Sequence, residues 1–322
     1  MEFVAHRFLF RCRVGGTILL NEHKGAALRG AFNEAVRAYC QYPHLTSCHP
    51  CALVSICPVS HLTSPVDEDG RRGSDVPRPY TVQPPIEAPT VFQHGDPFEF
   101  GITLYGRALR QLCIVLAGLR TRGPIPLGRK TLQGNGLLGR GALLLEEVVA
   151  WEPMAGSFAL VMRSQDQLAH MPDLGVTHQA VLRSAQAMGE VDRITLHFLT
   201  PTRIVDQGRL LHAPVFRPIF QRLLERISSL WEHYAGASPP FDFPQLMGLA
   251  ERVRTAEDST HWVDLDSYSS RRGVRTPIGG FMGTAIFEGP LTPLLPWLIW
   301  GEYTHVGKNA VKGDGWYRIE EG

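Results

Sequence analysis

The sequence has little net charge and no long hydrophobic run. Its 32 lysines and arginines nearly balance its 31 aspartates and glutamates, which gives a formal net charge of +1 over 322 residues. A polyanion-binding surface would therefore have to be a local basic cluster. No run approaches the ~20 apolar residues that cross a bilayer, and the N-terminus, residues 1–7, lacks a signal-peptide pattern. We expect a cytoplasmic protein, in which cysteines are reduced or metal-bound.

A P-loop is also missing from the sequence. The glycine-rich stretch 307–315 contains Lys308 and Lys312, but neither fits the pattern G-x-x-x-x-G-K-[ST]. Glycines let a backbone approach a ligand closely, and two lysines with exposed amides can hold phosphate. The stretch is therefore either a phosphate-binding loop or a turn before a last strand, 316–319.

Cysteine is concentrated in one short segment. Four of the six follow the spacing C-x7-C-x2-C-x5-C; they are Cys40, Cys48, Cys51 and Cys57. The C-x2-C pair is typical of tetrahedral zinc sites. An iron–sulfur cluster also takes four thiolates, and Cys57-Pro58 slightly favours it, but the x7 spacing matches no ferredoxin pattern. In a third alternative only the last three cysteines are ligands, and the fourth is His44, His49 or His61. We predict a structural zinc knuckle at 40–58.

Hydrophobic periodicity predicts an α+β protein of two domains, 1–150 and 151–322. The first half should contain strands at 3–14, 98–104 and 143–149, helices at 21–39 and 107–119, an irregular loop at 63–93 and a glycine-rich loop at 123–141. The second should contain strands at 158–162, 192–200, 256–268, 283–287 and 316–319, a helix at 214–234, and a compact apolar segment at 291–300. Each half is similar to a ferredoxin-like β-α-β-β-α-β unit. Asn21 is the expected N-cap of the first helix.

Several motifs together resemble a known family. Besides the cysteine segment, they are 25–32 (GAALRGAF), 100–106 (FGITLYG), 134–141 (GNGLLGRG), 267–272 (SYSSRR), 280–283 (GFMG), 301–308 (GEYTHVGK) and 313–317 (GDGWY). They are similar to motifs of the CRISPR-associated endoribonucleases of the RAMP superfamily, which cut precursor CRISPR RNA within its repeats. More narrowly, they resemble the branch with a cysteine-rich insert after the first helix, often found beside type III systems.

The resemblance implies tandem ferredoxin-like domains with RNA against the cleft and one face, and no membrane or DNA partner. It also implies metal-independent cleavage, in which the ribose 2′-hydroxyl attacks the phosphate and leaves a 2′,3′-cyclic phosphate and a 5′-hydroxyl. A type III or related effector complex is an expected partner. Asp314 departs from the family pattern and should put a negative charge beside the phosphate contact.

The chemistry needs groups that move two protons and a cation that balances the phosphorane. Histidine suits proton transfer because its ordinary pKa is ~6.5. Active residues of the family usually lie at or just after the first helix, so the resemblance implies His23, with Lys24 and Arg29 on the phosphate beside the helix N-terminus. Further candidates are Tyr39, His44 and His305.

RNA binding is expected from basic residues and glycines of the second half. They are Arg271, Arg272, Arg275, Gly307, Lys308, Lys312, Gly313 and Gly315. Aromatic rings that could stack on bases are Tyr268, Tyr303 and Trp316. Two alternatives are a non-catalytic RNA-binding subunit of the same superfamily and an iron–sulfur or zinc redox protein.

Overall fold

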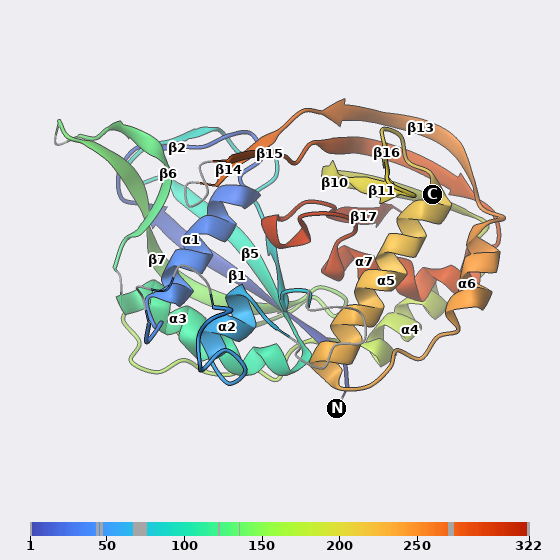
Figure 1. Cartoon of the computed structure of the whole chain (residues 1–322), viewed down its shortest axis with the longest axis horizontal. Helices are drawn as coiled ribbons and strands as arrows, with labels where there is room; N and C mark the ends of the chain where they lie inside the picture. The colour runs from blue at the N-terminus through green and yellow to red at the C-terminus, as the bar shows by residue number, and fades with distance from the viewer. Residues whose placement is uncertain are drawn as a thin grey trace. The chain divides into compact units, whose positions relative to one another are not determined.

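The chain divides into two compact units, whose helices and strands are labelled in Figure 1. The computed structural model describes residues 2–42, 45, 48–66, 76–121, 123–134, 136–269 and 274–320. Unit 1 comprises Met1–Val176 with His233–Ala235, and unit 2 comprises Thr177–Glu232 with Gly236–Gly322. The sequence predicts a boundary at residue 150. The observed boundary comes later because β8 pairs with β7, and β9 pairs with β1, both in the first sheet.

Unit 1 is built on an antiparallel sheet in the order β3-β5-β1-β7-β6, with β8 beside β7. Its strands are β1 (Val4–Val14), β3 (Tyr80–Gln83), β5 (Pro97–Tyr105), β6 (Ile125–Leu132), β7 (Leu138–Glu152), β8 (Ser157–Arg163) and β9 (Val176–Thr177). Phe10 and Phe100 are cross-strand partners, and their stacked rings lie 5.0 Å apart in the core.

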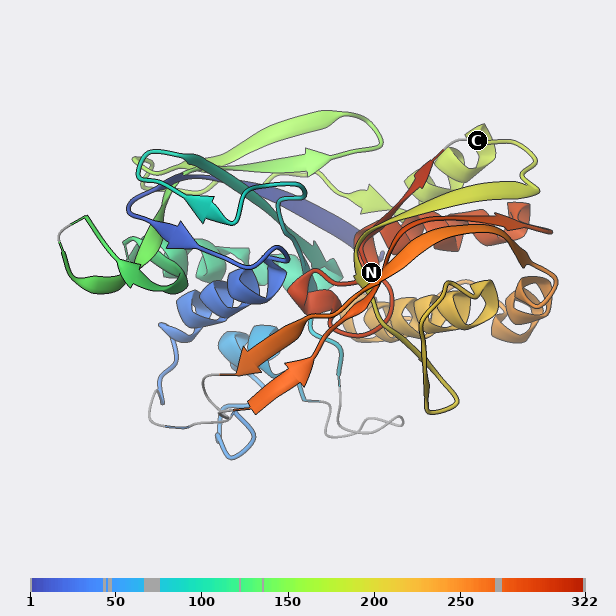
Figure 2. The same cartoon turned by 90° about the horizontal axis from the view of Figure 1, so that it is seen from above.

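Helices α1 (Gly25–Arg37) and α3 (Leu112–Thr121) lie on one face of this sheet, as Figure 2 shows. A 3₁₀ turn, η1 (Gly106–Gln111), precedes α3. Helix α1 is amphipathic, and its buried Phe32 packs on Tyr80 of β3, with the ring centroids 4.6 Å apart. When β6 and the short elements between them are left out, the order β1-α1-β3-β5-α3-β7 is the expected β-α-β-β-α-β.

Three expectations for unit 1 are wrong in detail. The stretch 63–93 contains β3 and β4 (Val91–Phe92), which pairs with β2 (Ile18–Leu19), besides the end of α2 (Pro58–Thr63). The stretch 123–141 is mostly the β6–β7 hairpin. Helix α1 begins at Gly25 with Lys24 as N-cap, and Asn21 instead accepts a hydrogen bond from Arg129. Strands this short are decided by their pairing partners rather than by local pattern.

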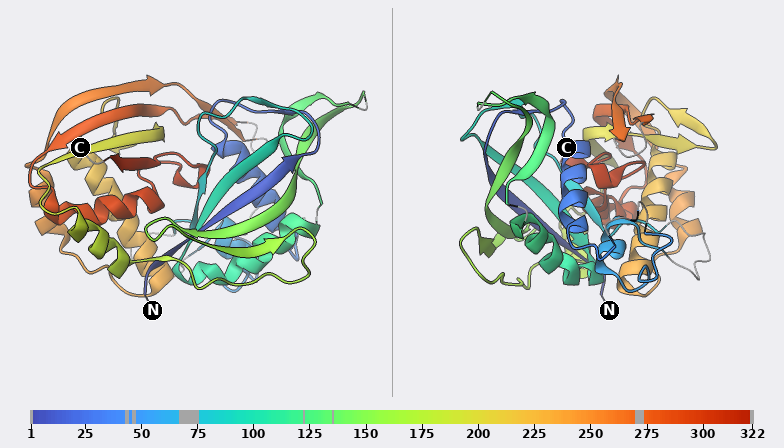
Figure 3. Two further views of the ribbon diagram at one scale, coloured as in Figure 1. Left: turned by 180° about the vertical axis from the view of Figure 1, so that it is seen from behind. Right: turned by 60° about the vertical axis from the view of Figure 1, so that its left-hand side comes forward.

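Unit 2 repeats the same plan with a sheet in the order β13-β16-β10-β17. Its β-α-β-β-α-β elements are β10 (Arg193–Thr202), α5 (Phe216–Ala235), β13 (Arg254–Val263), β16 (Gly280–Glu288), α7 (Leu295–Thr304) and β17 (Tyr317–Glu320). Helices α5 and α7 lie on one face of this sheet (Figure 3). The stripe of α5, including Phe220, Leu223 and Ile227, is fully buried, and the helix ends at Gly236 in the left-handed conformation.

Smaller elements decorate unit 2. They are α4 (His178–Ala187), β11 (Ile204–Asp206), β12 (Arg209–Leu211), α6 (Phe243–Ala250), β14 (Asp266–Ser269), β15 (Val274–Pro277), η2 (Thr292–Leu294) and η3 (Ala310–Lys312). Helix α4 was not expected from its polar stretch, and the strand expected at 256–268 is divided into β13 and β14. Among the described residues, no helix is long and apolar enough to cross a membrane.

Candidate functional site

Lys24 stands at the start of α1, where a phosphate contact is expected. Its side chain does not cap the helix. Instead, Nζ donates to the carbonyl oxygens of Glu22 at 2.9 Å and Ala88 at 2.8 Å. The residue is 2% exposed, and burial lowers the pKa of Lys24. The amine therefore holds the loop before α1 against the segment before β4, and it is not at the surface.

His23 and Arg29 are the more accessible candidates at this end of the helix. Both are half-buried, His23 directly before the N-cap and Arg29 in the second turn of α1. Arg29 lies beside the buried Tyr80 hydroxyl. Burial raises the pKa of the Tyr80 phenol, and the positive charge of Arg29 opposes part of that rise. The structure thus places an imidazole and a guanidinium near the helix N-terminus, where the macrodipole favours an anion.

Tyr39 lies in the turn after α1 and is half-buried. Its backbone N–H donates to the Val36 carbonyl oxygen at 3.2 Å. The 13 residues of α1 make a helix roughly 20 Å long at 1.5 Å per residue. His23 and Tyr39 are therefore at opposite ends of the helix and do not form one proton-transfer pair. His44, the neighbouring candidate, lies outside the described residues.

In unit 2, His305 occupies the loop between α7 and β17 and is fully buried. Its ring stacks on Trp316 with centroids 5.9 Å apart, and Nδ1 is 3.3 Å from the Asp314 carbonyl oxygen. Asp314 is likewise fully buried. The Asp314 carboxyl group, expected beside the phosphate contact, is therefore not at the loop surface. His305 likewise packs within the loop instead of facing solvent.

The glycines of this loop are required by its own packing. Gly307 and Gly315 have φ of +79° and +69°, and a Cβ would lie 2.5 Å from the Arg203 oxygen and 1.8 Å from the Val306 oxygen, respectively. The Lys308 and Gly315 amides donate to backbone carbonyls at 3.0 Å each. These two amides are thus not available to a phosphate. Gly313 is buried, Lys312 is half-buried and Lys308 is exposed.

Other expected RNA contacts lie on the β14–β15 hairpin. Arg275 is exposed and lies opposite Tyr268 in the strand register. Arg271 and Arg272 lie outside the described residues. Sequence reasoning missed Arg203, which donates to the Gly279 carbonyl at 2.9 Å and whose own carbonyl accepts from Lys308. The contact joins positions far apart in the chain, so no local pattern signals it.

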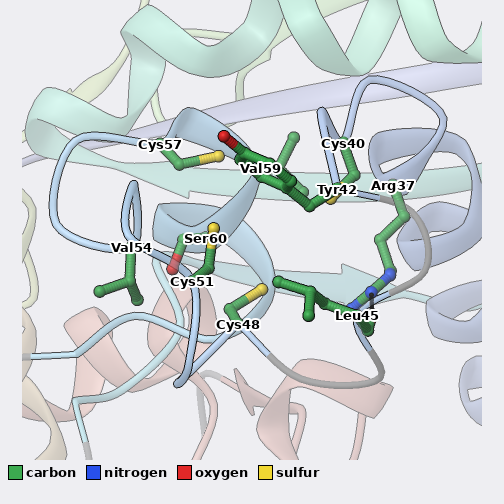
Figure 4. Close-up of a pocket in the computed structure, with 10 residues that line it drawn as sticks. All are labelled: Arg37, Cys40, Tyr42, Leu45, Cys48, Cys51, Val54, Cys57, Val59 and Ser60. Carbon is green, nitrogen blue, oxygen red and sulfur yellow. Dashed lines mark hydrogen bonds between the residues drawn. The ribbon is translucent and has the colours of Figure 1, made fainter.

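The four clustered cysteines line one pocket in unit 1, between the end of α1 and α2 (Figure 4). Thiols in one pocket match the donor chemistry that zinc prefers. Yet among the residues that the structure describes, no group of three or more His, Cys, Asp or Glu side chains is arranged to hold an ion. The structure thus gathers the predicted ligands without closing them into a metal site.

Comparisons with known proteins identify the family. Residues 196–317 match the model of the CRISPR-associated endoribonuclease Cas6, and residues 3–174 match a model described as an N-terminal domain, AF_1859_N. The second match covers more than half of the chain, so the chain belongs to the family with the AF_1859_N domain. The search of curated proteins finds no relative.

Solved structures of Cas6 proteins have a similar fold. A chain of a partial Cas6-RT-Cas1–Cas2 complex matches with a TM-score of 0.62 and 14% identity over 99% of this chain. A Cas6 product complex matches with a TM-score of 0.58 and 16% identity over 98% of this chain. Cas6 of Thermus thermophilus matches with a TM-score of 0.54 and 14% identity over 99% of this chain. Each of these two proteins is covered over 100% of its own length. The chain spans 46% and 29% of the matched chains in the two Cas6-RT-Cas1–Cas2 structures. At such identities, the likeness shows the fold alone.

Proposed function

We propose that the protein is an endoribonuclease that cuts repeat RNA in precursor CRISPR transcripts to make mature crRNA. The match of residues 196–317 to the Cas6 endoribonuclease model carries the proposal. Within unit 1, a half-buried histidine before the N-terminus of α1 supports it, because that end of a helix attracts anions such as phosphate.

The reaction is a transesterification that requires no metal. The 2′-oxygen loses its proton and attacks phosphorus, the bond from phosphorus to the 5′-oxygen breaks, and the departing oxygen gains a proton. The products carry a 2′,3′-cyclic phosphate and a 5′-hydroxyl. His23 makes one of the two proton transfers, and Tyr39, at the far end of α1, does not make the other.

Charge balance at the phosphorane is assigned to Arg29. A guanidinium keeps its charge at all working pH values and presents several N–H donors to phosphate oxygens. Lys24 is a positioning residue, because its amine holds the loop that carries His23 in place. Removing Lys24 should therefore disturb where His23 lies, whereas removing Arg29 should weaken stabilisation of the transition state.

The RNA is held by exposed or half-buried basic residues of unit 2. Among the described residues they are Lys308, Lys312 and Arg275. Arg271 and Arg272, which lie outside the described residues, stay predicted contacts. Phosphate contacts of this kind give affinity without sequence preference. Some matched Cas6 structures are complexes with a product or a substrate mimic, which supports RNA as the ligand. Association with a type III complex, or with partners such as reverse transcriptase, Cas1 and Cas2, stays a prediction.

The test is incubation of the purified protein with repeat RNA from the neighbouring CRISPR array in EDTA. Cleavage should leave a cyclic-phosphate end, and a 2′-deoxy substitution at the cut site should block it while binding persists. His23→Ala should reduce the single-turnover rate by ~10²–10⁴-fold. The matched control is His94→Ala, an exposed histidine of unit 1, which should cleave normally.

Each other outcome has a definite meaning. RNA binding without any product would make the protein a non-catalytic crRNA-binding subunit. Cleavage that survives in His23→Ala would move the proton transfer to another group. Absence of both binding and cleavage would reject the proposed substrate.

A further inference from the structure

Four thiols of one short segment share a pocket whose other walls are largely apolar. Cys48 is buried, with 8% of its surface exposed, while the other three are half-buried. The remaining wall is formed by Arg37, Tyr42, Leu45, Val54, Val59 and Ser60. Figure 4 shows the cysteines arriving from the end of α1, from the turns that follow and from the start of α2. The fold thus brings soft ligands from separate turns to one place.

The segment that carries these thiols has little else to hold it. Among its described residues between Arg37 and Pro58, no helix or strand is present, and only Cys48 is buried. Turns fix the spacing: the Cys51 N–H donates to the Cys48 carbonyl at 3.0 Å, and the Cys57 N–H donates to that of Leu53 at 2.8 Å. Small segments without a core are commonly held by disulfides or by a structural metal.

We propose that the four cysteines bind one structural zinc ion, which ties the end of α1 to the start of α2. Each thiol loses its proton to solvent as its sulfur bonds to zinc, so the occupied site is negatively charged. Arg37 lies in the pocket wall, where its guanidinium donates to the Leu45 carbonyl at 3.0 Å. Its positive charge is therefore held beside the thiolates, as an outer partner that favours them.

Zinc binding requires the thiols to turn inward, because no described group of three ligands is arranged for an ion in this structure. All four already line the pocket, so we expect side-chain rotations to suffice. Of the alternative histidine ligands, His61 has Nε2 2.9 Å from the Ser55 carbonyl oxygen, and His49 is exposed. These positions favour the four cysteines over a set that includes His49 or His61, and His44 lies outside the described residues.

The first experiment measures zinc and iron by mass spectrometry in the full chain purified under reducing conditions. We expect about one zinc per chain, a colourless solution, and zinc release when the thiols are modified. Replacement by cobalt should give the intense visible bands of a tetrahedral thiolate site. Chelation should lower the unfolding temperature, and zinc but not magnesium should restore it. The readout is metal content, so it is independent of whether the protein cleaves RNA.

Variants then locate the ion. The double substitution Cys48→Ser with Cys51→Ser should abolish zinc binding, whereas Cys57→His, which keeps a zinc ligand, should retain it and show that the segment still folds. The matched control is Cys113→Ser, because Cys113 is exposed on α3 and does not line the pocket. The proposal is overturned by stoichiometric iron with visible absorbance, by disulfides among these cysteines, by a metal-free protein, or by zinc that survives the double substitution.

Discussion

Two glycine-rich regions look alike in the sequence and differ in the structure. The hairpin tip, residues 132–138, joins β6 to β7 in unit 1, and Figure 3 shows this hairpin extending beyond its sheet. The terminal loop, residues 305–316, joins α7 to β17 in unit 2. Both combine glycines with nearby basic residues, and both belong to the motifs that suggested the family.

Their surroundings are opposite. At the hairpin tip, a Cβ on Gly134 or Gly136 would meet nothing within 4 Å, and Leu132 and Leu138 are each 70% exposed. In the terminal loop, Gly307 and Gly315 abut backbone atoms, and Val306 is fully buried. Glycine frequency thus indicates backbone freedom, but it does not distinguish an open turn from a close-packed loop.

The largest expected effect is that of Gly315→Ala. Its Cβ would lie 1.8 Å from the Val306 oxygen at φ +69°, so the loop would have to move. We expect the free energy of unfolding to fall by about 3 kcal/mol or more. Each kcal/mol lost lowers Tm by roughly 2–4 °C. Thermal unfolding checks it, with Gly134→Ala as the matched control near zero. Equal losses in both variants would break the comparison.

A second pair of alanine substitutions separates the cost of a left-handed backbone from the cost of a steric clash. Gly136 and Gly307 have similar φ values, +76° and +79°, but only Gly307 is crowded, with 2.5 Å from its Cβ position to the Arg203 oxygen. Gly136→Ala should cost about 1–2 kcal/mol, the price of a left-handed residue. Gly307→Ala should cost clearly more. Denaturant unfolding measures the stability of the two variants. A larger loss of stability in Gly136→Ala than in Gly307→Ala would contradict the prediction.

A smaller effect should distinguish the two regions by their apolar side chains. Val306→Thr keeps the shape but buries a hydroxyl, which should cost about 1–3 kcal/mol. Leu138→Thr, at a position 70% exposed, should change stability by less than about 0.5 kcal/mol. Unfolding midpoints of the two variants measure the difference. Destabilisation by Leu138→Thr instead would mean that the hairpin tip is covered by a partner.

Much of the fold was predictable because it depends on local pattern. The stripe of α5 repeats at helical spacing, and β1 and β10 are long enough to show their character. Helix α7 gives no such signal, since Leu298, Trp300 and most of its other residues are buried on all sides. Strand β3 has four residues and exists through its pairing with β5.

The candidate site was predictable only in part. The sequence places His23 and Lys24 before a helix, but the bond from Lys24 to Ala88 spans 64 residues and has no local signal. Asp314 was expected to put a negative charge beside the phosphate contact. Its side chain is instead fully buried. Local sequence therefore indicated that His23 and Lys24 precede α1, whereas long-range contacts decide which of these side chains is buried.

The smallest expected effect is on RNA binding, not on stability. The test compares one exposed basic residue from each region. Lys308 lies in the terminal loop and Arg140 follows the hairpin tip. If Lys308 contacts a phosphate, Lys308→Ala should weaken RNA binding severalfold for all sequences and reduce the slope of log K against log salt by ~0.7, without changing Tm. Arg140→Ala should leave both unchanged. Titrations of repeat RNA at several salt concentrations measure the two slopes. An equal change in Arg140→Ala would place RNA along the hairpin as well, so the two regions would then differ in packing but share a ligand.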